Sequence, residues 1–336
     1  MVGFSYLGIY IIKRSMNIKW FSELPLDGKV DRGYTNMRTE FAWFVAQDAS
    51  HTSLYNLPNL ETNSVDIGII IIPKNVEKFL FMDILKHLQR VCKLYGFMQE
   101  GPSWYFQSLP LGESFWFYDI MLNADFVLAH NDVDKHYYEG LLNKPTYINP
   151  TLMIEDSITD LPVDYSQRDG VMLGGNLVRW YGGFNSLMVA SISNSKIYAP
   201  QMGRMLQEEL SMNEIEHLPY MEWKDWIHAL NKVKYAVHLN PNTIGGTFSL
   251  NCAYLGIPCI GNIDSNTQRL CFPDLSFRSD DLLNAKKAMS RLITDEDFYN
   301  DCSKTSKEHY KALFTEKNYV SNWKVILADI AKIYPL

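Results

Sequence analysis

The chain has 336 residues, 47% of them hydrophobic, which is enough to bury the cores of two domains. Its net charge of −7 is concentrated in residues 1–160, where 19 Asp and Glu outnumber 13 Lys and Arg. This balance argues against a broad nucleic-acid surface, which needs clustered Lys and Arg, but leaves a local basic groove open. Five scattered cysteines, without a CxxC pair, argue against a zinc site and indicate reduced thiols in a cytoplasmic protein.

The first 15 residues precede a cleaner pattern of elements. The apolar run 2–12 is about 11 residues long, short of the ~20 that span a bilayer. Lys13 and Arg14 follow this run, whereas a signal peptide carries its positive residues first. We therefore expect no membrane span and treat 1–15 as an N-terminal extension.

From residue 16 onward, strands and helices alternate, as in a parallel α/β domain. The expected strands are 17–24, the almost wholly apolar 65–72, one ending at 97–99, 125–129 and 146–149. The expected helices are 36–49, 76–95, 114–124 and 133–142. These elements predict a first doubly wound domain over 16–155 and a linker over 156–168.

A second α/β set is predicted over 169–318. Its expected strands are 170–173, 196–199, 217–220, 235–239 and 258–261. Its expected helices are 184–192, 202–210, 222–233, 247–255, 282–293 and 295–306. A last helix, within 319–336, could cross back to the first domain.

Polar side chains follow two strands of the first domain, at the edge where open α/β sheets bind ligands. Glu100, ionised at pH 7, could take the proton of an acceptor hydroxyl, or could only cap the next turn. His130 and Asp132 could line or orient the acceptor site, or be structural. Trp104 and Tyr105 could stack sugars or flipped bases. The aromatic residues of helix 114–124 are more simply core.

The stretch 237–262 predicts one βαβ unit whose helix opens directly after Gly245 and Gly246. Unpaired N–H groups and the positive end of the helix dipole then face the strand end, where an anion would bind. Alternatively, the two glycines only form a tight turn.

The loop after strand 170–173 reads GGNLVRWYGG. Gly174, Gly175 and the guanidinium of Arg179 are candidates for binding phosphate. The glycine spacing differs from the GxGxxG of dinucleotide dehydrogenases, and the chain contains neither a P-loop nor a GxSxG elbow.

Three segments, GGNLVRWYGGFNS, LPYMEWKDWIHALNKVKYAVHLNP and GGTFSLNCAYLGIPCIG, together resemble the C-terminal half of a GT-B glycosyltransferase. The similarity is greatest to the large retaining family that uses nucleotide-diphosphate sugars. It implies an α/β fold of two doubly wound Rossmann-like domains facing each other across a cleft. It also implies a transferase with a UDP-sugar as favoured co-substrate.

Site residues carried over from the resemblance all lie in the second domain. The diphosphate would contact the first glycine loop, at Gly175, Asn176 and Arg179, and the helix start, at Gly246, Thr247 and Phe248. The base would be held at Tyr220, Met221 and Trp223.

The sequence departs from that family in two features. A pair of glutamates, the second of which grips the ribose, is replaced by Thr243 and Asn251. Asn251 can still bond a ribose, but without the strength of a carboxylate. Asn176 stands at an expected Arg, for which Arg204 or Arg269 could substitute.

These observations predict sugar transfer from a nucleotide-diphosphate donor. Arg179 and the amides at Gly246 and Thr247 would stabilise the departing diphosphate. We therefore expect no cofactor and no essential metal. The phrases RTEFAWFVAQDASH and MQEGPSWYF resemble bacteriophage glycosyltransferases, some of which modify hydroxymethylated bases in DNA. Such an enzyme would work in the host cytoplasm. The acidic first half leaves a glycan or lipid acceptor open as an alternative. The two departures from the family pattern leave open that the protein is a non-catalytic module that binds a sugar nucleotide or another protein.

Overall fold

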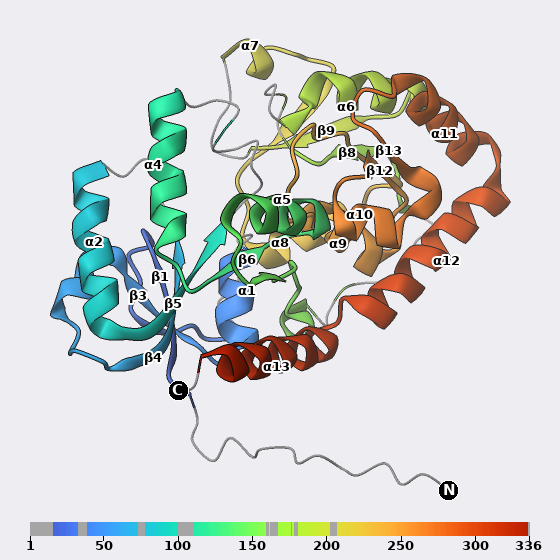
Figure 1. The fold of residues 1–336 in the computed structure, drawn as a ribbon. Coiled ribbons are helices and arrows are strands. Elements are labelled where there is room, and N and C mark those ends of the chain that lie inside the picture. The colour runs from blue at the N-terminus through green and yellow to red at the C-terminus, as the bar shows by residue number, and fades with distance from the viewer. Residues whose placement is uncertain are drawn as a thin grey trace, which may run out of the picture.

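The computed structural model describes residues 16–32, 39–72, 78–99, 106, 110–158, 161, 167–175, 177, 181–201 and 207–334. These residues form two separate sheets, each flanked by helices (Figure 1). The strand order is β2-β3-β1-β4-β5-β6-β7 in the first sheet and β10-β9-β8-β11-β12-β13 in the second. All pairs are parallel except the short antiparallel β2–β3 edge. The structure confirms the predicted α/β class.

The first sheet has an apolar core on each face. Its strands are β1 (Ile18–Ser22), β2 (Gly28–Lys29), β3 (Ser50–Ser53), β4 (Val65–Ile71), β5 (Cys92–Gln99), β6 (Phe126–Ala129) and β7 (Thr146–Ile148). One face packs on α1 (Thr39–Ala46), and the other packs on α2 (Lys78–Val91), α4 (Leu111–Leu122) and α5 (Asp132–Leu142). A short 3-10 helix, η1 (Leu54–Asn59), follows β3.

The second sheet comprises β8 (Val171–Leu173), β9 (Ile197–Pro200), β10 (Ile215–Leu218), β11 (Tyr235–His238), β12 (Cys259–Asn262) and β13 (Ser276–Phe277). Its helices are α6 (Gly183–Ala190), α7 (Gln207–Leu210), α8 (Trp223–Leu230), α9 (Thr247–Leu255), α10 (Asn266–Cys271), α11 (Leu282–Thr294) and α12 (Glu296–Leu313). Short 3-10 helices are η2 (Glu155–Ile158), η5 (Ser191–Ser193) and η6 (Pro273–Leu275).

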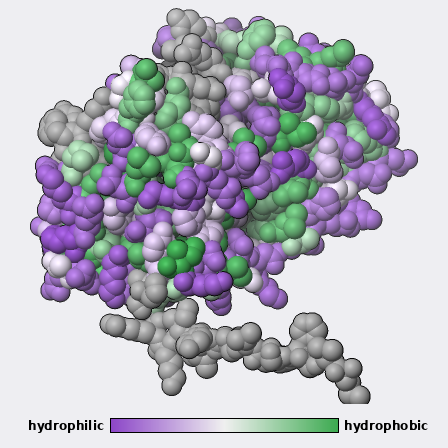
Figure 2. Space-filling view, viewed as in Figure 1, coloured by the Kyte–Doolittle hydropathy of each residue, from purple (hydrophilic) through white to green (hydrophobic). Residues whose placement is uncertain are grey.

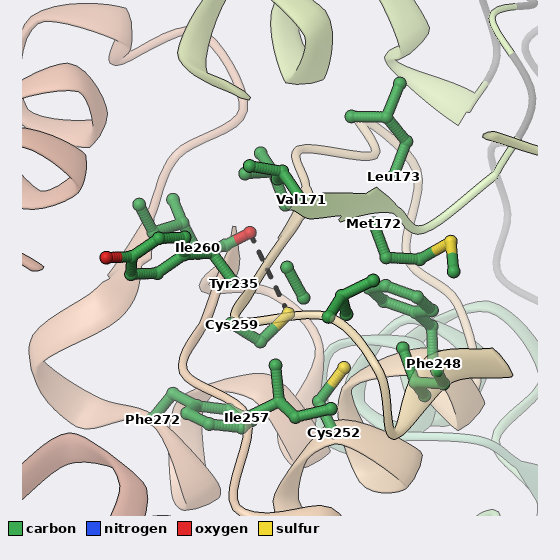
Figure 3. Close-up of a cluster of buried hydrophobic side chains, with 14 of the residues drawn as sticks. Val171, Met172, Leu173, Tyr235, Phe248, Cys252, Ile257, Cys259, Ile260 and Phe272 are labelled. Atoms are coloured by element: carbon green, nitrogen blue, oxygen red, sulfur yellow. Dashed lines mark hydrogen bonds between the residues drawn. The ribbon is translucent and has the colours of Figure 1, made fainter. Parts of the chain in front are cut away.

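The core of the second sheet surrounds α9 (Figure 3). Phe248 and Cys252 project from this helix toward Val171 and Met172 of β8 and Ile260 of β12, and all five side chains are buried. Helix α9 is thereby fixed on the sheet by its first two turns. The position of its N-terminus follows from this packing.

The last helix, α13 (Glu316–Ile333), packs on the first sheet although α12, which precedes it, belongs to the second (Figure 1). Trp323 of α13 is buried in the core around α1. The Tyr319 hydroxyl donates to Asn149 Oδ1 at 2.6 Å and accepts from Gln47 Nε2 at 2.6 Å. The chain therefore passes between the two domains twice, once after β7 and once before α13.

Several element boundaries differ from the sequence-based expectation. The helix expected over 76–95 ends at Val91, because residues from Cys92 onward pair with β4 in the sheet. Strand β10 ends at Leu218, so Tyr220 follows the strand instead of closing it. Strand β3 was not expected, and α12 continues to Leu313 beyond the expected end at residue 306.

The surface in Figure 2 is mainly hydrophilic, with hydrophobic side chains gathered over α4. Leu111 and Phe115 of this helix are exposed, whereas Phe117, Ile120 and Met121 are buried, so the helix expected to be core is buried on one face only. Among the described residues, no helix is long and apolar enough to cross a membrane.

Candidate functional site

The start of α9 is a helix N-terminus without a side-chain cap. Gly246 occupies the N-cap position with φ of 77°, and the first turn contains no acidic residue. A Cβ atom at Gly246 would lie 1.9 Å from Thr267 Oγ1, so a side chain does not fit there. The uncapped N–H groups and the helix dipole together favour an anion at this point.

Two hydroxyl groups hold the turn at Gly246. Thr267 Oγ1 donates to the Gly246 carbonyl at 2.8 Å, and Ser249 Oγ donates to the same carbonyl at 3.0 Å. The two hydroxyl oxygens lie 2.9 Å apart. Because the carbonyl is fixed from two sides, the direction of the first N–H groups of α9 is fixed as well.

Four buried polar atoms in the segment 238–251 have no hydrogen-bond partner in the part of the chain that the structure describes. They are Nε2 of His238, Nδ2 of Asn240, Oγ1 of Thr243 and Nδ2 of Asn251. Asn240 and Asn251 are each only 1% exposed. Since buried polar groups in folded proteins are nearly always paired, this concentration indicates a site for a polar ligand.

His238, the last residue of β11, is held neutral by its surroundings. Burial lowers the pKa of its imidazole to about 4. Its ring packs edge-on against Phe248 of α9, with the centroids 5.5 Å apart. An added Cβ at Gly174 would lie 2.2 Å from His238 Cγ. This histidine therefore lies between the first glycine loop and α9.

The loop after β8 approaches β11 through both of its glycine pairs. The Gly174 N–H donates to the Val237 carbonyl at 2.9 Å, and Gly175 packs against Tyr181. Gly182, with φ of 66°, lies so close to the Leu239 carbonyl that a Cβ would be 2.0 Å from its oxygen. The glycines predicted to bind phosphate thus lie at the carboxyl end of β11, beside the start of α9.

The predicted base-holding segment has one exposed and two less exposed members. Tyr220 is 58% exposed, Met221 is partly buried against the core, and Trp223 is buried. One turn further along α8, Trp226 Nε1 donates to Asn251 Oδ1 at 3.2 Å. Asn251, one of the departures from the family pattern, therefore contacts α8.

Three threonine hydroxyls join the two domains at the start of α9. Thr247 Oγ1 is hydrogen-bonded to Thr39 Oγ1 at 2.7 Å and to Thr151 Oγ1 at 2.9 Å, and the latter two are 3.2 Å apart. Thr39 and Thr247 are the first residues of α1 and α9. The first described residue of α1 and the N-terminus of α9, which belong to different domains, therefore meet here.

His130 also contacts the glycine turn. An added Cβ at Gly245 would lie 2.9 Å from His130 Nδ1, and the His130 ring lies 5.4 Å from the Trp43 ring. The neighbouring Asn131 donates from Nδ2 to the Ile244 carbonyl at 3.4 Å. His130, predicted from the first domain, thus lies beside Gly245, predicted from the second.

Asp132 pairs with a cation of the opposite domain. Its Oδ2 accepts from Arg269 at 2.6 Å, and its N–H donates to Asn266 Oδ1 at 3.4 Å. Both charged side chains are partly exposed. Here two candidates from the sequence, an acceptor-site carboxylate and a substitute phosphate ligand, bind each other across the domain boundary.

Five predicted site residues, and Arg204 as a possible substitute for the expected Arg, lie outside the described residues; the five are Glu100, Trp104, Tyr105, Asn176 and Arg179. Their assignments stay predictions. Among the described residues, no group of three or more His, Cys, Asp or Glu side chains could hold a metal ion.

Sequence reasoning missed residues whose role depends on long-range contacts. Thr39, Thr151 and Thr267 lie around the start of α9, and none of them was predicted as a site residue. Gln99, at the end of β5, is 1% exposed with both amide atoms unpartnered. Its place in the segment MQEGPSWYF, directly before the predicted Glu100, is the signal that could have drawn attention to it.

No family model matches the sequence, and no curated protein matches it. Solved structures do match the fold. An alpha-glucosyltransferase in complex with UDP and a 13-mer DNA containing an HMU base has a TM-score of 0.62 at 14% identity, covering 93% of this chain and 99% of that one. The alignment therefore includes most of both domains.

The chain has the GT-B fold. The alpha,alpha-trehalose 6-phosphate synthase from Burkholderia multivorans gives a TM-score of 0.63 at 9% identity, with 95% and 97% of the two chains covered. Sucrose-phosphate synthase from Thermosynechococcus elongatus gives 0.59 at 14% identity, with 80% and 74% covered. The predicted two-domain GT-B architecture is confirmed.

Proposed function

We propose that this GT-B protein is a glycosyltransferase that moves a sugar from a UDP-sugar to a hydroxyl group of an acceptor. The observation that carries the proposal is the start of α9, where an uncapped helix N-terminus adjoins a segment with four unpartnered buried polar atoms. An anion with polar groups attached, such as a nucleoside diphosphate, satisfies both features.

The leaving diphosphate is stabilised by fixed dipoles. The N–H groups after Gly246 are held in direction by Thr267 and Ser249, so they need not reorganise as negative charge develops on the diphosphate. We propose that Arg179 adds a positive charge and that this set needs no essential metal. Transfer that persists in EDTA would support this point, and loss restored by Mg²⁺ or Mn²⁺ would contradict it.

The first domain supplies His130 next to Gly245, on the acceptor side of the diphosphate. An imidazole there can hydrogen-bond the transferred sugar or the acceptor hydroxyl. Glu100, which follows β5, is the proposed base. Asp132, which is paired with Arg269, is assigned to domain docking instead of proton transfer.

We propose a hydroxymethylated base in DNA as the acceptor, and hence that the protein modifies bacteriophage DNA. Support comes from the resemblance of two first-domain segments to phage glycosyltransferases and from the fold likeness to an alpha-glucosyltransferase bound to modified DNA. The excess of acidic residues in 1–160 weighs against it and favours a glycan or lipid acceptor as the alternative.

Titration with UDP and UDP-glucose tests the donor site. Binding below millimolar concentration is expected, and its absence for every nucleotide sugar tried would overturn the proposal. Arg179→Ala should weaken UDP binding at least tenfold, whereas the control Arg291→Ala, which removes an exposed arginine of α11, should not.

Transfer of labelled glucose to hydroxymethylcytosine DNA, compared with unmodified DNA, tests the acceptor. Glu100→Gln should keep UDP binding and lose turnover, and Glu61→Gln, an exposed surface change, serves as the control. Donor hydrolysis that modified DNA does not alter would refute the DNA acceptor. Donor binding without hydrolysis or transfer to any acceptor would point to a non-catalytic module.

A further inference from the structure

Asn251 presents a hydrogen-bond donor where a carboxylate would present an acceptor. The indole N–H of Trp226 can only donate, and it bonds Asn251 Oδ1 at 3.2 Å. The amide orientation is therefore set, with the oxygen toward Trp226 and the NH₂ group directed away from it. That NH₂ group has no partner, although the residue is 1% exposed.

The position of Asn251 on α9 relates it to the ligand. It lies four residues after Thr247, hence on the same helix face and about 6 Å further along the axis. In a nucleoside diphosphate bound by its phosphates at the helix start, the group at that distance is the ribose. The NH₂ of Asn251 then meets a ribose oxygen.

The consequence concerns the ribose 2′-hydroxyl. A carboxylate only accepts hydrogen bonds, so it requires hydroxyl donors and bonds them with charge assistance. Asn251 instead donates, and either remaining oxygen of a deoxyribose can accept that bond. The segment 235–262, from β11 to β12, contains no Asp or Glu whose carboxylate could accept hydrogen bonds from the ribose hydroxyls instead of Asn251.

We propose that the donor site discriminates only weakly between ribonucleoside and 2′-deoxyribonucleoside diphosphate sugars, and that the Trp226–Asn251 pair is the cause. This inference rests on the proposed function, because it assumes a nucleoside diphosphate at α9. It identifies a wider donor class, which includes dUDP- and dTDP-sugars.

Calorimetric titration with UDP and 2′-deoxy-UDP tests the inference, since the two probes differ in one hydroxyl. The wild-type protein should bind UDP less than about tenfold more tightly, the ratio expected for one neutral hydrogen bond. The isosteric Asn251→Asp change restores an acceptor beside Trp226. It should raise the UDP preference by a further factor of about ten or more.

A control and a second variant complete the test. Asn194→Asp, an exposed change in the turn before β9, should leave the ratio unchanged. Trp226→Phe removes the indole donor and lets the amide rotate, so it should raise the UDP preference even if Asn251→Asp does not fold. A wild-type preference well above tenfold, or a ratio unmoved by both variants, overturns the inference. Failure of both UDP and 2′-deoxy-UDP to bind overturns the proposed function itself.

Discussion

Replacement of Gly246 by alanine tests whether the start of α9 is the ligand site. The residue has φ of 77°, a conformation that costs an L-residue roughly 1–2 kcal/mol. Its new Cβ would also lie 1.9 Å from Thr267 Oγ1 and 2.4 Å from Ser265 Oγ. Relief of such overpacking costs about 1–3 kcal/mol more. We therefore expect a loss of about 2–5 kcal/mol in the free energy of unfolding.

The predicted loss lowers the melting temperature by several degrees, at roughly 2–4 °C per kcal/mol for a domain of this size. Moving Thr267 also breaks its bond to the Gly246 carbonyl, so the first N–H groups of α9 turn away from their present direction. UDP binding should weaken at least tenfold at a temperature where circular dichroism shows the variant folded.

Gly140→Ala provides the matched control. Gly140 lies within α5, and an added Cβ there meets nothing within 4 Å. This change should stabilise the protein by about 0.5–1 kcal/mol and leave UDP binding unaltered. If Gly246→Ala is destabilised as expected but binds UDP like the wild type, the diphosphate does not bind at the start of α9.

Three further predictions concern the domain boundary and His238. Thr247→Val, which removes the hydroxyl bonded to Thr39 and Thr151, should weaken UDP binding more than Thr247→Ser; equal binding by both would contradict a role for this hydroxyl. The Asp132→Asn variant and the double variant Asp132→Asn, Arg269→Gln should lose similar activity, because each removes the same ion pair. The loss relative to the wild type should shrink at high salt, which screens the pair. If Asp132→Asn were inactive while the Arg269→Gln variant kept its activity, Asp132 would act directly in catalysis. In the unfolded chain His238 binds a proton below about pH 6.5, whereas in the folded protein the pKa of His238 is about 4. The free energy of unfolding should therefore fall by about 3 kcal/mol in total as the pH drops from 6.5 to 4. In urea unfolding, the free energy of unfolding of His238→Phe should depend less steeply on pH over this range than that of the wild type. An unchanged slope would contradict the burial of His238 as the cause of the pH dependence.

The sequence predicts the region around α9 well because its boundaries are set by local chemistry. Gly246 and Gly256 both adopt positive φ at the two ends of the helix, and the helix has the bounds that these glycines indicate. The strands on either side are short apolar runs ending at polar residues. Here local conformational preference and tertiary packing agree.

Prediction from the sequence fails where no residue marks the boundary between a helix and a strand. It also fails where buried polar side chains form hydrogen bonds with each other. The run from Cys92 to Tyr95 contains no Gly or Pro, and pairing with β4 decides that it is strand. Strand β3 looks too polar to be buried, yet His51 bonds Ser22 at 2.8 Å and the Leu26 carbonyl at 2.6 Å. Such compensation depends on partners more than 20 residues away.

The candidate site shows the same division. The glycines and Asn251 could be found in one segment, but the hydroxyl cluster joins residues up to 208 positions apart in the sequence. Thr39 lies in a segment that resembles phage glycosyltransferases, but neither Thr39 nor Thr151 has a residue type or spacing that marks it as a site residue. Only the docking of the two domains gives them a role.

The segment 244–247 serves ligand binding and domain docking together, and this sharing has a thermodynamic consequence. The first domain contacts it through Asn131 at Ile244, His130 at Gly245 and Thr39 at Thr247. A ligand that favours one arrangement of this segment must favour the docked domains by the same free energy. The contacts of Asn131 and Thr39 are neutral hydrogen bonds worth about 0.5–1.5 kcal/mol each, so they can break and re-form during turnover. Apolar packing in their place would hold the domains together whether or not a ligand was bound.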